Sequence, residues 1–143
     1  QIVADYLTGE GYLTKLNVNY RKADEKQSGS DIDVLAVHGM DHTVIVGDCK
    51  SWQMGFSGDW MVREDIKSAK WFRRYFKAIF MPEWEEGLAP KVEEEFGTRK
   101  FTYTIYCAWL DGSSEQLKKQ QTVAENPIEL CRLPTSSLKR SNG

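Results

Sequence analysis

Residues 101–110 (FTYTIYCAWL) constrain the fold more than any other stretch of this chain. The segment contains no charged residue and is rich in Thr, Tyr, Ile and Trp, which favour strands. A strand that is apolar on both faces is usually buried on both faces, inside a sheet covered by helices. We therefore predict a central strand over 101–110.

Four other segments show the alternation or the β-branched runs that are typical of strands: 13–20, 32–37, 43–47 and 128–133. The second and third of these are close enough in sequence to form a hairpin, and the last is predicted to be an edge strand. Helical spacing predicts the end of a helix over 1–7 and a long helix over 60–80 that ends before Pro82.

The acidic stretch 83–96 is expected to form one or two short helices, because Gly87 and Pro90 interrupt it. The order of elements describes an α/β domain with a mixed sheet. We expect a single domain over 1–133 and a flexible tail over 134–143.

Composition excludes several classes of protein. The 143 residues suit one domain, and 19 Lys and Arg against 21 Asp and Glu exclude a uniformly basic nucleic-acid coat. No apolar run approaches the roughly 18 residues of a membrane span, and no secretion signal opens the chain. The three cysteines are expected to be buried free thiols, so a cytoplasmic protein is expected.

Charged residues stand at the ends of the two hairpin strands, where they are unusual: Asp31, Asp33, Asp48 and Lys50. A hairpin folded symmetrically about the Met40–Asp41 bond would place Asp33 opposite Asp48. The same register would place Asp31 opposite Lys50, and opposed side chains point to the same side. The hairpin would thus bring two carboxylates and an ammonium together.

Two ionised carboxylates this close repel each other unless a cation lies between them. Carboxylates, carbonyl groups and water are the ligands that Mg²⁺ prefers, and an adjacent lysine can offset charge in a phosphoryl transition state. Asp33, Asp48 and Lys50 therefore form a minimal site for phosphodiester hydrolysis. Asp31 is the alternative ligand, since a pairing slip of two residues would exchange it with Asp33.

Asp33, followed along the chain by Asp48-Cys49-Lys50, resembles the sequence motif of the PD-(D/E)xK nuclease superfamily. The predicted order of elements over about residues 1–110 is similar to its restriction-endonuclease-like αβββαβ core. The local sequence looks closest to the Holliday-junction-resolvase and methyl-directed restriction branches. The resemblance implies a DNA endonuclease that uses Mg²⁺, with Mn²⁺ as a substitute.

Carried over by position, the resemblance implies that Asp33 and Asp48 hold the metal with the backbone carbonyl of Cys49. Lys50 would act on the attacking water. Many members add a Glu from the first helix, and its counterpart here is Gln1 or a residue upstream. Gln1 cannot supply that negative charge, which leaves open whether one or two metal ions bind.

Basic side chains recur on one side of the predicted helix 60–80: Arg63, Lys67, Lys70, Arg74 and Lys77. Such a row would contact DNA phosphates, or would be an ordinary solvated face. Gln53, just after the motif, is a further candidate for a phosphate contact.

Two hypotheses from different classes follow. The first is a Mg²⁺-dependent DNA endonuclease, whose substrate could be branched or modified DNA. Cutting both strands of a duplex would call for a homodimer, or the chain would be part of a larger protein. The second is an inactive nuclease-fold module that binds DNA or RNA. The substitution at Gln1 and the acidic net charge favour this second hypothesis.

Overall fold

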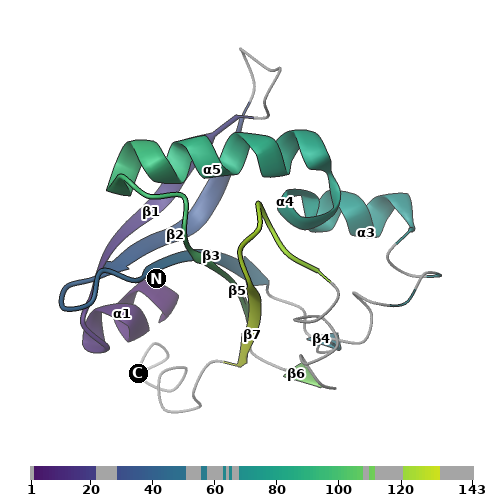
Figure 1. Ribbon diagram of the computed structural model, residues 1–143. Helices are drawn as coiled ribbons and strands as arrows, with labels where there is room; N and C mark the ends of the chain where they lie inside the picture. Colours follow the sequence, from purple (N-terminus) through teal and green to yellow (C-terminus); the bar gives the residue numbers. More distant parts are fainter. Residues whose placement is uncertain are drawn as a thin grey trace.

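The computed structural model describes residues 2–21, 29–50, 68–107 and 121–132, with Arg63, Asp65 and the backbone of 56–57 and 110–111. Within this part, one five-stranded mixed sheet has the strand order β1-β2-β3-β5-β7 (Figure 1). Its strands are β1 (Tyr12–Tyr20), β2 (Ser30–His38), β3 (Val44–Lys50), β5 (Thr102–Cys107) and β7 (Ile128–Arg132). β1, β2 and β3 pair antiparallel, whereas β5 is parallel to both β3 and β7. A small parallel pair is formed by β4 (Phe56–Ser57) and β6 (Leu110–Asp111).

The predicted central strand is confirmed over Thr102–Cys107. β5 lies between β3 and β7, and its residues from Tyr103 to Cys107 are all buried. Leu110, the last residue of the predicted strand, belongs instead to β6, in the small pair. The predicted edge position of β7 is also confirmed.

Helices cover both faces of the large sheet (Figure 1). On one face, α1 (Ile2–Gly9) packs Val3 and Leu7 against Val34, Ala36 and Tyr106. On the other face lie α3 (Lys70–Tyr75), α4 (Lys77–Phe80) and α5 (Pro82–Phe96). Sequestering both faces of the sheet removes its apolar side chains from water, which is the main favourable term in folding. No helix among the described residues has both the length and the apolar character needed to cross a membrane.

The predicted single helix over 60–80 is wrong for its described part. Ala69 is extended, with ψ of 135°, and Phe76 interrupts the helix with φ of −120° and ψ of 51°. A straight helix would place Lys77 and Ala78 beside the exposed Arg74. Because the chain turns at Phe76, Ala78 is instead buried and Lys77 half-buried.

The predicted break in the stretch 83–96 is also wrong, because α5 continues through Pro90. An interior proline costs about 3 kcal/mol by removing a backbone hydrogen bond and crowding the preceding turn. Pro90 is exposed, while Leu88, Ala89 and Val92 are buried against the sheet. Burial of these side chains offsets the cost, and the helix ends at Gly97 in the left-handed conformation.

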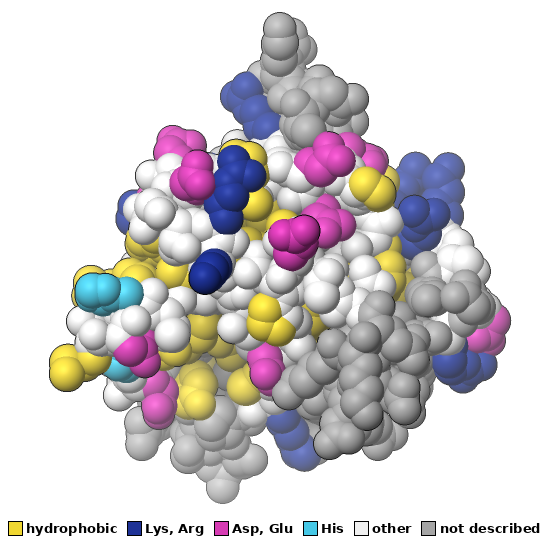
Figure 2. Space-filling model, viewed as in Figure 1, with side chains coloured by type: hydrophobic (Ala, Val, Ile, Leu, Met, Phe, Trp, Pro, Cys, Tyr) yellow, Lys and Arg dark blue, Asp and Glu magenta, His cyan; other side chains and the backbone are white. Residues whose placement is uncertain are grey.

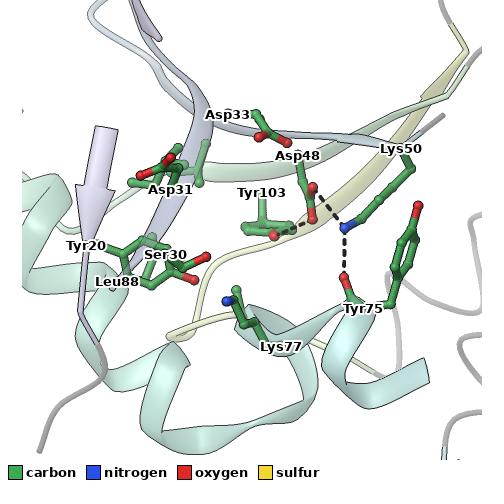
Figure 3. A pocket seen from close by; sticks show the side chains of 14 residues that line it. Tyr20, Ser30, Asp31, Asp33, Asp48, Lys50, Tyr75, Lys77, Leu88 and Tyr103 are labelled. Atoms are coloured by element: carbon green, nitrogen blue, oxygen red, sulfur yellow. Dashed lines mark hydrogen bonds and ion pairs between the residues drawn. The ribbon is translucent and has the colours of Figure 1, made fainter. Parts of the chain in front are cut away.

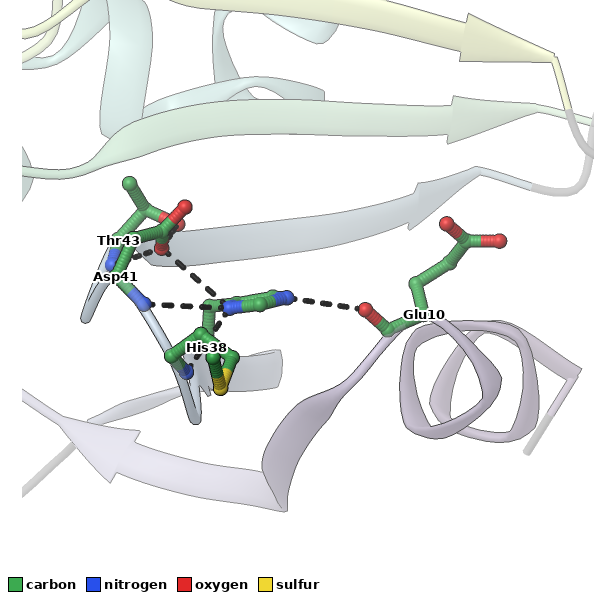
Figure 4. Close-up of polar contacts among 5 residues, drawn as sticks. Glu10, His38, Asp41 and Thr43 are labelled. Atoms are coloured by element: carbon green, nitrogen blue, oxygen red, sulfur yellow. Dashed lines mark hydrogen bonds and ion pairs between the residues drawn. The ribbon is translucent and has the colours of Figure 1, made fainter.

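His38 joins the hairpin turn to the turn that follows α1 (Figure 4). Its Nε2 atom lies 3.1 Å from the carbonyl oxygen of Glu10, and its Nδ1 atom accepts a hydrogen bond of 3.1 Å from the Met40 amide. A carbonyl only accepts and an amide N–H only donates, so this pattern assigns the proton of a neutral ring to Nε2. Gly11 must lie close to this ring, and its φ of 96° suits glycine.

Replacing Gly11 with Ala is expected to lower the free energy of unfolding by about 2 kcal/mol. The new Cβ would lie 2.9 Å from His38 Nε2 at a strained φ. Chemical denaturation measures the change. Gly9→Ala is the matched control, because a Cβ there has no neighbour within 4 Å. Equal losses in the two variants would contradict the predicted steric clash.

Candidate active site

β2 and β3 separate at the end of their shared ladder. Their register agrees with the prediction from Val37–Val44 to Val34–Gly47. Beyond that pair, β2 remains paired with β1, and β3 remains paired with β5. The two strands therefore form a fork, and the predicted acidic residues lie at its opening.

The predicted cross-strand opposition of Asp33 with Asp48 is not part of the ladder, and neither is that of Asp31 with Lys50. Instead, Asp33 Oδ2 accepts a hydrogen bond of 2.8 Å from the backbone amide of Cys49. The Asp33 carboxylate thus holds the amide of β3 at the fork. Asp33 and Asp48 nevertheless line the same pocket, as expected of two residues that share a site.

An irregularity in β1 and β2 accompanies the fork. Ile32 and Leu35 pack into the same apolar cluster, whereas strict alternation would place them on opposite faces. Asn17, which would pair with Asp33 in the β1–β2 register, has a φ of 53°. The alternation of faces is therefore interrupted at Asp33, which allows Ile32 and Asp33 both to line the pocket.

Asp48 and Lys50 share one face of β3, as predicted, and form an ion pair. Lys50 Nζ lies 3.2 Å from Asp48 Oδ1, and the two side chains are only 12% and 16% exposed, respectively. The Tyr103 hydroxyl donates a hydrogen bond of 2.9 Å to Asp48 Oδ2. Both oxygens of this carboxylate are thereby held in place.

Lys50 is fixed from a second side by α3. Its ammonium donates a hydrogen bond of 2.7 Å to the carbonyl oxygen of Tyr75, and it lies 4.0 Å from the centroid of the Tyr75 ring (Figure 3). The Phe76 ring centroid is 5.0 Å away. A desolvated ammonium over aromatic faces is stabilised by the ring quadrupoles. Contacts within the protein therefore fix the position of the amine.

Burial raises the pKa of Asp48, and the nearby Asp33 charge raises it further, whereas Lys50 and the Tyr103 hydroxyl lower it. Burial, followed by the Asp48 charge, raises the pKa of Tyr103 well above its ordinary value, so this hydroxyl remains a donor. The ionised form of Asp48 is thus costly in the isolated protein. A further cation beside Asp33 and Asp48 would reduce that cost.

Lys77 brings a second ammonium to a cavity of about 200 Å³ that is also lined by the three aspartates. Figure 3 shows its side chain reaching from α4 into the pocket, below Asp48 and Tyr103. The Lys77 Nζ atom lies 4.1 Å from the Trp84 ring centroid. Burial, together with the Lys50 charge, lowers the pKa of Lys77. Three carboxylates and two ammonium groups therefore line one small cavity.

The oxygen donors fit a hard divalent cation only in part. Asp33 and Asp48 supply two carboxylates to one pocket, and their mutual repulsion is what such a cation would relieve. Within the described ranges, no group of three or more His, Cys, Asp or Glu side chains could hold a metal ion. Backbone carbonyls and water would therefore have to complete the coordination, as is common for Mg²⁺.

The other predicted site residues that the structure describes do not form one surface. Asp31 is exposed and accepts a hydrogen bond of 3.3 Å from Asn19 Nδ2, although it also lines the pocket. The predicted basic row is wrong as a single row: Arg63 pairs with Asp65 at 2.7 Å, Lys77 enters the pocket, and Lys70 and Arg74 remain exposed on α3. Gln1, Gln53, Lys67 and the tail 134–143 lie outside the described residues.

Two residues of the site were missed by sequence reasoning. Tyr103 reaches Asp48 only because β5 pairs parallel to β3, with Tyr103 beside Val46. Tyr75 meets Lys50 through its backbone carbonyl, which carries no sequence signal. All three cysteines were expected to be buried, but only Cys107 is, whereas Cys131 is half-buried and Cys49 exposed. All three are free thiols, as predicted.

Comparison with known proteins yields a similarity of fold. No protein-family model matches the chain, and no curated protein matches it. A similar solved structure is the crystal structure of AF1548, a protein of unknown function, with a TM-score of 0.50 and 15% sequence identity. The match covers 99% of this chain, which spans 64% of the AF1548 chain. At this identity the likeness supports a mixed α/β fold and carries no information on activity.

Proposed function

We propose that this chain is a metal-dependent DNA endonuclease with a restriction-endonuclease-like core. The observation that carries the proposal is the buried Asp48–Lys50 ion pair, which opens onto the same pocket as Asp33 at the fork of β2 and β3. A buried ion pair is weak evidence for a stabilising role, because desolvation consumes much of its Coulomb energy. A carboxyl group with a raised pKa in a small polar pocket, such as Asp48, is by contrast typical of an active site.

Asp33 and Asp48 would hold Mg²⁺ in this proposal, together with the backbone carbonyl of Cys49. The ion, when bound, would supply Lewis-acid stabilisation of the phosphoryl charge. The hydrogen bonds from the Cys49 amide and the Tyr103 hydroxyl fix one oxygen of each carboxylate. The two side chains therefore need little reorganisation to bind a cation.

Lys50 would orient the attacking water and offset the negative charge that grows on the phosphate oxygens. Its ammonium has three donors, and the Tyr75 carbonyl and Asp48 occupy two of them. The remaining donor is available to a water or to a phosphate oxygen. Hydrolysis adds the water oxygen to phosphorus and releases the sugar oxygen of the neighbouring nucleotide.

Lys77 would provide a second contact to the phosphate. The mutual repulsion of Lys50 and Lys77 contributes to the lowered pKa of Lys77, and an anion between the two would relieve it. Packing on the Trp84 ring holds the Lys77 side chain toward the cavity. Of the predicted basic row, Lys77 is thus the residue that we assign to the scissile phosphate.

Incubation of the chain with supercoiled plasmid DNA tests the proposal. Nicked or linear products are expected with Mg²⁺ or Mn²⁺, and none with EDTA, because removing the metal removes the Lewis-acid stabilisation of the phosphoryl charge. Agarose gels measure the products. DNA binding without cleavage under every metal condition would contradict the proposal and support the inactive binding module.

A further inference from the structure

Trp71 is a large aromatic side chain that is left on the surface of α3, where it is 62% exposed. Single exposed apolar side chains are ordinary in soluble proteins, so exposure alone indicates no function. Among the described residues, the other large apolar side chains that are exposed are Leu13, Leu16 and Met40, on β1 and in the hairpin turn. Trp71 differs from them because it lies on a helix that reaches the pocket and carries exposed basic side chains.

α3 connects Trp71 to the pocket. Tyr75 follows four residues later, so the two aromatic side chains lie on the same face of the helix, one turn apart. Tyr75 lines the pocket, and its ring lies 4.0 Å from Lys50 Nζ. A row of two aromatic residues therefore runs from the surface to the proposed catalytic lysine.

Positive charge accompanies this aromatic row. Lys70 and Arg74 are exposed and lie four residues apart on α3, beside Trp71. Within the part of the chain that the structure describes, neither has an ion-pair partner, whereas Arg73 donates a hydrogen bond to the Phe80 carbonyl oxygen. In Figure 2, Lys and Arg side chains gather over the position of α3, while Asp and Glu side chains are frequent over α5.

We propose that Trp71 is a stacking platform for an unpaired base of the DNA strand that enters the active-site pocket. The inference rests on the proposed function, because it takes the pocket as the place of the phosphate. Lys70 and Arg74 would contact the strand backbone while a base stacks on the Trp71 ring. Base pairs in a duplex have their faces covered by neighbouring pairs, so this surface selects DNA with unpaired bases near the cut.

Fluorescence anisotropy of a labelled oligothymidylate in EDTA, where no cleavage is expected, tests the inference. Trp71→Ala should weaken single-strand binding roughly ten-fold, since one base–aromatic stack is worth about 1–3 kcal/mol. Binding of the same strand in a duplex with oligoadenylate should not change. Trp71→Phe should retain most of the affinity, because it keeps a ring to stack on.

Met40→Ala is the matched control, since it removes an 86% exposed apolar side chain at the hairpin turn. A second readout is tryptophan fluorescence, which the strand should quench in the natural chain and quench less in Trp71→Phe. Unchanged single-strand affinity in Trp71→Ala, or an equal loss for strand and duplex, would overturn the inference. Plasmid cleavage with unchanged single-strand binding refutes this inference alone, whereas Trp71-dependent binding without any cleavage refutes the proposed function alone.

Discussion

Replacing Lys50 with Met is expected to lower the rate of DNA cleavage by roughly 100- to 1,000-fold, the usual cost of removing one donor that stabilises developing charge. Met occupies much of the same volume between Asp48 and the Tyr75 ring, so the fold should persist. The ammonium that holds water and phosphate would be gone. Single-turnover cleavage at saturating Mg²⁺ measures the loss, and circular dichroism checks the fold.

Lys15→Met is the control for this substitution, because Lys15 forms an ion pair with Glu95 on the outside of the molecule. Its cleavage rate should match that of the natural chain. The experiment also separates two roles of Lys50. If Lys50 acted only by keeping Asp48 ionised, raising the pH would restore cleavage in Lys50→Met. We expect no restoration, and full recovery at high pH would refute direct contact of Lys50 with the reacting groups.

The strands were predictable from the sequence because their signals are local. β-Branched runs, alternation and a turn of suitable length predict the hairpin, and its register followed from matching apolar residues near the turn. The absence of charge over 101–107 predicts a buried strand, and burial confirms it. Each of these inferences depends on residues close together in the chain.

The fork of β2 and β3 was not predictable in the same way. It depends on β3 continuing along β5, a strand more than fifty residues away in sequence, after its pairing with β2 has ended. The Tyr103 hydroxyl bond to Asp48 depends on the same parallel register. Sequence reasoning therefore found the acids and the lysine but placed them in a regular ladder.

The helices were predicted less well, because tertiary packing overrides the local sequence signals there. Pro90 indicates a break, but α5 continues because its buried face is large enough to offset the cost. The segment before Phe80 indicates one long helix, but the chain bends at Phe76, which is fully buried. That bend removes Lys77 from the basic row and brings it to the pocket. The wrong prediction of one continuous helix therefore also misplaced Lys77 relative to the site.

Replacing Asp48 with Asn is expected to stabilise the protein in EDTA at neutral pH while abolishing cleavage. Burial raises the pKa of Asp48 in the folded state, so the protonated form favours folding. That contribution is present below the unfolded pKa and is lost as the pH rises through the raised folded pKa. Asn imitates the neutral form at every pH, so the free-energy difference between the two chains should increase with pH over this interval.

Urea unfolding of both chains across this pH range measures the difference. Asp31→Asn is the matched control, because it removes an exposed carboxylate at the same pocket and should preserve cleavage. A chain that becomes more stable when it loses activity indicates a residue retained for chemistry rather than for folding. A decrease in stability of Asp48→Asn at neutral pH would instead assign Asp48 a structural role as the partner of Lys50.

The effect of a divalent cation on stability can be measured with the same three chains. Mn²⁺ bound to the folded state raises the unfolding temperature by mass action, because the unfolded chain does not bring Asp33 and Asp48 together. The rise should occur in the natural chain and in Asp31→Asn, and it should be absent in Asp48→Asn. An equal rise in all three chains would mean that the ion binds elsewhere. The cost of ionising Asp48 would then have no metal to relieve it, and the proposal of metal-dependent cleavage at the fork would be untenable.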